Sequence, residues 1–129
     1  TIQLALTAAE TGHLVFGTLH TNSAPSTINR IIDVFPPEQQ EQVRSQIAST
    51  LRCVITQKLL KRIDKAGRVA AFEIMICNTA IRNLIRENKV FQIANSMQMG
   101  KAEGQMLMEN SLKDLIAQKA ISPADAEID

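Results

Sequence analysis

The sequence of 129 residues contains no tryptophan and no tyrosine, and aromatic residues make up only 3% of it. The stacking platforms on which single-stranded nucleic acids bind are therefore missing. With 14 basic and 13 acidic residues the net charge is +1, which leaves no electrostatic footprint for nucleic acid or an anionic membrane. No apolar run approaches the length of a membrane span, and we expect neither a transmembrane segment nor a signal peptide. These absences favour a globular protein of one domain or slightly more.

Cysteines are few, and the lysine that a P-loop uses to bind phosphate is missing from the segment with P-loop glycine spacing. Cys53 and Cys77 lie far apart in apolar surroundings, so we expect reduced core thiols in a cytosolic protein, without a redox pair or a metal site. Gly12 and Gly17 have the spacing of a P-loop, but Thr18-Leu19 follows where lysine and serine or threonine are required. We interpret that match as a coincidence.

The N-terminal part of the chain predicts a helix, a strand and a second helix in succession. Gly12 is placed to end the first helix, and Ser23 followed by Ala24-Pro25 is typical of a helix start. Between them lies a short apolar run, residues 14–19, that is typical of a strand buried on both faces of a sheet. This alternation predicts an α/β fold of the doubly wound kind.

The remainder predicts one hairpin and otherwise helices. Residues 38–52 have a helical apolar spacing, and two strands, 53–63 and 68–76, flank a turn at 64–67. After Asn78 only helical patterns follow, with Thr79 as the expected cap of the first helix. A stripe of apolar side chains near the C-terminus predicts a core-facing helix: Met108, Leu112, Leu115 and Ile116.

Polar residues follow the predicted strand at once, and they are the first candidates for a site. His20, Thr21, Asn22 and Ser23 would lie beyond the carboxyl end of the strand, where open α/β sheets bind ligands. Taken singly, a histidine in such a place more often satisfies backbone groups than binds a ligand.

The whole string T-G-H-L-V-F-G-T-L-H-T-N-S-A, however, resembles the His box of the secretion and pilus motor ATPases. The resemblance implies a RecA-like hexamer that hydrolyses ATP at its subunit interfaces. Within it, His20 would sense the γ-phosphate, and His13 would be structural or lie at a subunit boundary. Thr18, Thr21 and Asn22 would support the nucleotide site by positioning the residues that touch the nucleotide.

A second string separates the branches of that superfamily. Residues 80–87 match the A-I-R-N-L-I-R-E motif of the type IV pilus retraction (twitching-motility) ATPases at every position: Ala80, Ile81, Arg82, Asn83, Leu84, Ile85, Arg86 and Glu87. At 100° per residue Ile81, Leu84 and Ile85 share one face of the helix. We expect the other face, with both arginines, to be free for a partner, although such a face is usually just solvated.

The resemblance covers essentially the whole chain and implies its organisation. We expect residues 1–78 to be the C-terminal half of a RecA-like ATPase core and residues 79–129 to be a small all-helical C-terminal domain. Walker A, the aspartate-rich box and the Walker B glutamate would precede Thr1, so the chain would be part of a longer protein and inactive alone. ATP and Mg²⁺ would bind only to the longer protein.

Partners and alternatives follow from the same resemblance. It implies a homohexamer on the cytoplasmic side of the inner membrane, held there by the pilus platform protein. Pilus assembly and secretion ATPases share the His box but usually carry a CxxC zinc module and lack the retraction motif. A non-catalytic helical interaction module on an α/β scaffold is the other alternative.

Overall fold

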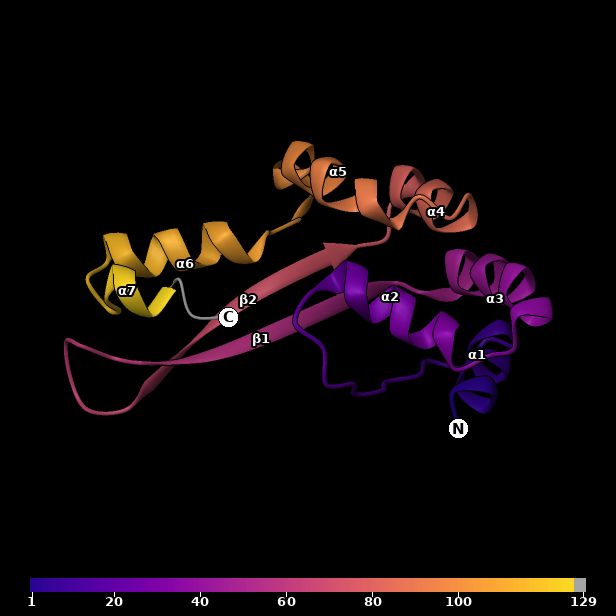
Figure 1. Cartoon of the computed structure of the whole chain (residues 1–129), viewed down its shortest axis with the longest axis horizontal. Helices are drawn as coiled ribbons and strands as arrows, with labels where there is room; N and C mark the ends of the chain where they lie inside the picture. Colours follow the sequence, from indigo (N-terminus) through magenta and orange to yellow (C-terminus); the bar gives the residue numbers. More distant parts are fainter. Residues whose placement is uncertain (127–129) are drawn as a thin grey trace.

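Two long antiparallel strands run through the molecule, with helices along them (Figure 1). The structure, a computed structural model, describes residues 1–126. The elements are α1 (Ile2–Glu10), α2 (Ala24–Asp33), α3 (Pro37–Thr50), β1 (Cys53–Lys61), β2 (Arg68–Ile76), α4 (Thr79–Arg86), α5 (Ile93–Met99), α6 (Met108–Ala117) and α7 (Pro123–Ala126), with short 3₁₀ turns η1 (Val90–Gln92) and η2 (Lys101–Glu103). Helices α1 to α5 gather around one end of the ribbon, and α6 and α7 lie toward its hairpin turn.

The predicted hairpin is confirmed. β1 and β2 pair in register from Cys53 opposite Ile76 to Lys61 opposite Arg68. At the turn Gly67 has φ +109°, a conformation that other residues adopt only with strain. The Arg62 guanidinium donates two hydrogen bonds to the Asp64 carboxylate, at 2.8 and 2.6 Å, and thereby lowers the pKa of Asp64 to about 2.

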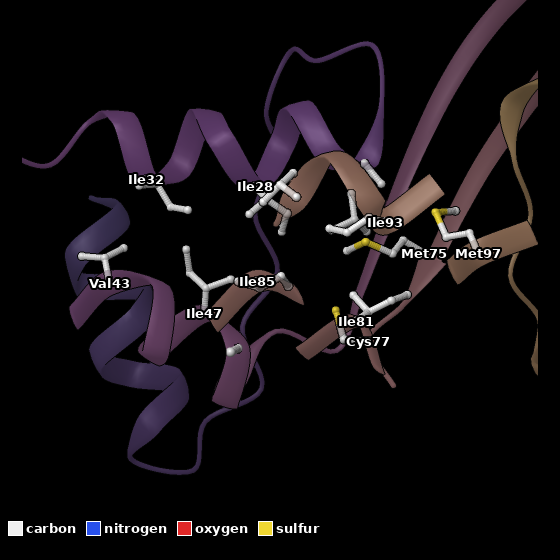
Figure 2. Packing of buried hydrophobic residues seen from close by; sticks show 14 of the residues in the cluster. Ile28, Ile32, Val43, Ile47, Met75, Cys77, Ile81, Ile85, Ile93 and Met97 are labelled. Atoms are coloured by element: carbon white, nitrogen blue, oxygen red, sulfur yellow. The ribbon is translucent and has the colours of Figure 1, made fainter. Parts of the chain in front are cut away.

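The main core lies between the end of the ribbon and helices α2, α3, α4 and α5. Figure 2 shows isoleucines of α2, α3, α4 and α5 in this core. Fully buried side chains in this cluster include Ile28, Ile47, Ile81, Ile85 and Ile93. The second predicted helix and the helical spacing predicted for residues 38–52 are explained by this core, because the buried residues of α2 and α3 face it.

A second, smaller cluster lies on the ribbon nearer the hairpin turn. Leu60 of β1 and Ala71 of β2 are buried there under Leu112 of α6 and Ile121. The predicted stripe on α6 is thus confirmed as core, since its other three members are partly buried against the same cluster. Both clusters are built on one ribbon.

The predicted strand at residues 14–19 is wrong. These residues have no regular structure, and Leu14 and Phe16 are 80% and 88% exposed. A strand is held by hydrogen bonds to a neighbouring strand, and within the described residues β1 and β2 pair with each other. Segment 14–19 finds no partner among them, so residues 1–126 form no doubly wound sheet. The fold is a mixed one of helices and a small antiparallel sheet.

Residues 79–126 are helical apart from one β-bridge, which joins Met106 to Ile74. Their helices do not pack as a separate body: α4 and α5 share the main core with α2 and α3, and α6 packs on β2. An independent all-helical domain is therefore not confirmed. The division at residue 78 stays a prediction, and the last three residues of the predicted second unit lie outside the described part.

Candidate functional site

The two histidines of the His box contact different helices. His13 lies at the end of α1, where its Nδ1 is 3.1 Å from the Ala8 carbonyl oxygen and 3.3 Å from the Thr11 hydroxyl. The backbone N–H of His13 also donates to the Ala8 carbonyl, at 3.0 Å. His13 thus satisfies carbonyl groups that a helix end leaves without partners, an arrangement that fits the structural role predicted for it.

His20 lies at the other end of the exposed segment, beside α2. The Arg30 side chain donates to its carbonyl oxygen at 3.3 Å, which holds the backbone while leaving the imidazole exposed. An open cavity of about 460 Å³ lies here, lined by His20, Thr21, Asn22, Ser26, Asn29, Arg30, Asp33 and Val34. Three of the predicted site residues therefore meet in one place, and Thr18 is not part of the lining.

The start of α2 fixes the turn that carries these residues. Ser23 is the N-cap, as predicted, and its hydroxyl and that of Ser26 each accept from the other residue's backbone N–H at 3.2 Å. One turn further, the hydroxyls of Thr21 and Thr27 are 2.6 Å apart. The polar wall of the cavity is therefore tied to a helix end rather than to a mobile loop.

The first N–H of α2 donates to a side chain from a distant part of the chain. The Ala24 N–H donates to the carboxylate of Glu73 at 2.7 Å. Glu73 belongs to β2 and is only 6% exposed. The sequence does carry a signal for it, an acidic residue within a strand that is otherwise apolar after Arg68.

The motif helix α4 buries the face that the sequence predicts. Ile81 and Ile85 are fully buried, and Leu84 is partly buried against the same cluster. Its N-cap is Asn78 rather than the expected Thr79: the Asn78 side chain accepts from the Ile81 N–H at 2.9 Å. Asn78 can take this position because its side-chain amide oxygen reaches the third N–H of the helix.

The other face of α4 is not uniformly free, which corrects the expectation for Arg82. Its guanidinium donates to the Ala48 carbonyl oxygen near the end of α3. Because helix α3 ends two residues later, this bond lies where carbonyls lack intrahelical partners. The remaining polar side chains of the motif are exposed, and the Arg86 guanidinium donates to the Asn83 side chain at 3.0 Å.

The expectation that both cysteines lie in the core holds for one of the two. Cys77 is buried, and burial raises the pKa of its thiol to about 11, so the group stays protonated near neutral pH. Cys53 is exposed on the open face of the ribbon and is not a core thiol, because successive strand residues point to opposite faces. Within residues 1–126 no three His, Cys, Asp or Glu side chains gather closely enough to hold a metal ion.

Comparison with known proteins assigns the chain to a family. Residues 1–123 match the family model for type II/IV secretion system proteins. The chain belongs to this family. Over 126 residues, or 98% of its length, it is 56% identical to the twitching motility protein of Neisseria gonorrhoeae and to the type IV pilus retraction ATPase PilT of Pseudomonas aeruginosa.

A solved structure gives the same assignment. The crystal structure of the pilus retraction motor PilT with bound ADP superposes with a TM-score of 0.88 at 52% identity, over 98% of this chain and 35% of that one. The two curated relatives are covered to 34% and 36%. This member of the secretion-system family therefore spans about a third of the length of these relatives. No helix within residues 1–126 is long and apolar enough to cross a membrane.

The contact of Arg82 with α3 leads to a stability prediction. Arg82→Ala removes a hydrogen bond from a charged donor to a part-buried carbonyl, so we expect a loss of about 1–3 kcal/mol of unfolding free energy. Arg86→Ala, one turn further along the same helix, removes an exposed bond and should change it by about 0.5 kcal/mol or less. Urea denaturation of the two variants measures the difference. Equal midpoints would show that Arg82 does not hold α3.

Proposed function

We propose that the chain is the C-terminal part of a hexameric ATP-driven motor that retracts type IV pili. The observation that carries the proposal is its likeness, along almost its whole length, to two proteins named for twitching motility and pilus retraction. The eight-residue match at 80–87 supports retraction rather than pilus assembly or secretion.

In this proposal the cavity beside α2 faces the nucleotide. ATP hydrolysis depends on positioning and on donors aimed at the γ-phosphate, where charge is stabilised during transfer. The exposed imidazole of His20 can donate a hydrogen bond to a phosphate oxygen in either charge state. Thr21 and Asn22 line the same cavity and would position His20 or a bound water, whereas Thr18 would act from outside the lining.

Other parts of the site would come from the longer protein. Residues 18 and 19 are threonine and leucine where a P-loop needs lysine and a magnesium ligand. We therefore expect ATP and Mg²⁺ to bind only when the remaining two-thirds of the motor is present. That part would also cover the exposed side chains of Leu14 and Phe16. Together the two parts would form the RecA-like core.

Assembly and location complete the proposal. The motor would be a homohexamer on the cytoplasmic side of the inner membrane, attached to the pilus platform protein. The exposed side of α4, with Ala80, Asn83, Arg86 and Glu87, would meet that platform or a neighbouring subunit. Arg82 would contribute indirectly, by keeping α4 fixed to α3.

Substitutions of the two histidines should have different effects, one on ATP turnover and the other on stability or assembly. In the full-length protein His20→Ala should lower ATP turnover by about 10- to 1,000-fold, the range for removing one well-placed donor, while nucleotide affinity changes less. His13→Ala is the matched control, and it should act through stability or assembly because it closes the end of α1. Steady-state ATPase assays on hexamers test both. Turnover that survives His20→Ala but not His13→Ala would reverse the two roles.

A substitution on the exposed side of α4 should abolish pilus retraction without affecting ATP hydrolysis. Arg86→Ala in the full-length protein should leave stability within about 0.5 kcal/mol and spare the hexamer and its ATPase activity, because the side chain is exposed. Pilus retraction should nevertheless be lost. Arg68→Ala removes the same charge from an exposed site at the hairpin turn and should retract normally.

Twitching assays in cells that carry only one variant measure the difference. Normal twitching with Arg86→Ala would show that this side of α4 is merely solvated. Loss of pilus extension instead of retraction would favour an assembly ATPase.

A further inference from the structure

Glu73 joins two helices that are far apart in sequence. One carboxylate oxygen, Oε2, accepts from the N–H of Ala24 at 2.7 Å, and the other, Oε1, accepts from the N–H of Met108 at 3.2 Å. These two residues are the first of α2 and of α6. A single buried side chain of β2 therefore accepts from the first N–H of both helices.

The chemistry of the two contacts requires a carboxylate. The first N–H groups of a helix have no partner within it, and the helix dipole makes that end favourable for negative charge. A carboxylate offers two acceptor oxygens, whereas a glutamine offers one oxygen and an amide group that only donates. Burying this group without both partners would be unfavourable, because an unsatisfied buried charge loses its hydration.

On its α2 side, Glu73 reaches the turn that carries His20. The Ala24 N–H directly follows the N-cap Ser23, and the Thr21 hydroxyl is bonded to Thr27 on the first turns of α2. Residues 20–22 line the cavity described above. A displacement of the turn therefore displaces the group that Glu73 holds.

On its other side, β2 is attached to the segment that begins α6. The Phe72 N–H donates to the Ser111 hydroxyl at 3.0 Å, and Ile74 and Met106 exchange backbone hydrogen bonds at 2.8 and 2.9 Å. The side chain of Gln105 donates to and accepts from the backbone of Ile76, at 2.6 and 2.7 Å. Together with Glu73, these contacts attach the second half of β2 to residues 105–111, along the edge that does not pair with β1.

We propose that Glu73 is a positioning residue that couples the turn at residues 20–23 to helix α6. Its two oxygens make the starts of α2 and α6 move as one unit, so a change at the cavity reaches the C-terminal helices through β2. This inference rests on the proposed function in one respect: nucleotide bound in the cavity would be what moves the turn. The coupling itself is a property of the hydrogen bonds.

The test uses the full-length protein and amide hydrogen exchange followed by mass spectrometry. Thr21→Val removes the bond to Thr27 and serves as the disturbance at the turn. We expect it to speed exchange in the first turn of α6 by about threefold or more, which matches the lower end of coupling energies between neighbouring residues. In E73Q protein the same disturbance should leave that turn unchanged, because one of the two bonds is lost.

Two matched controls separate coupling from simple loss of structure. E109Q makes the same chemical change at an exposed site in the first turn of α6 and should preserve the response to Thr21→Val. Met108→Pro deletes the donor N–H together with the methionine side chain, at a position where proline suits a helix and Leu107 is already extended. Met108→Ala keeps the donor but loses the same side chain. Met108→Pro should abolish the response, and Met108→Ala should keep it.

The outcomes are decisive even if E73Q does not fold, because the Met108 pair poses the same question. An equal response in the Met108→Pro and Met108→Ala proteins would overturn the coupling. So would an equal response in folded E73Q and E109Q. Because no nucleotide is used, failure of the ATPase prediction for His20 would leave this result standing, and the reverse also holds.

Discussion

The buried face of the β1–β2 ribbon is the constraint on which the rest of the structure depends. The strand pleat places Val54, Leu60, Ala71 and Met75 on one face, and both apolar clusters are built on these positions. Glu73 lies on the same face between the clusters. A shift of one residue in pairing would turn the apolar side chains to solvent and move the carboxylate away from both helix ends.

Features determined by nearby residues could be predicted from the sequence. The hairpin, the Ser23 cap, the apolar face of α4 and the core stripe of α6 each depend on spacings within a few residues. The failures concern partners far along the chain. Residues 14–19 have the composition of a strand but no strand beside them, and the partners of Arg82 and Glu73 lie 34 to 49 residues away.

The same distinction applies to the two motifs that identify the family. In the His box the pattern located the cavity residues His20, Thr21 and Asn22 but not the β2 carboxylate of Glu73, which accepts from the first N–H of the helix that follows them. In the α4 motif, helical periodicity separated buried from exposed positions, yet it could not show that the Arg82 guanidinium is hydrogen-bonded to a carbonyl oxygen of α3. Motif positions that look equivalent on a helical wheel thus have different physical roles.

In the proposed motor the cavity beside α2 faces ATP. The most direct measurement is a crystal structure of the full-length protein with Mg²⁺ and a non-hydrolysable ATP analogue. A nitrogen of the His20 imidazole is expected within about 2.7–3.2 Å of a γ-phosphate oxygen. A nucleotide bound elsewhere, with His20 facing solvent, would contradict it.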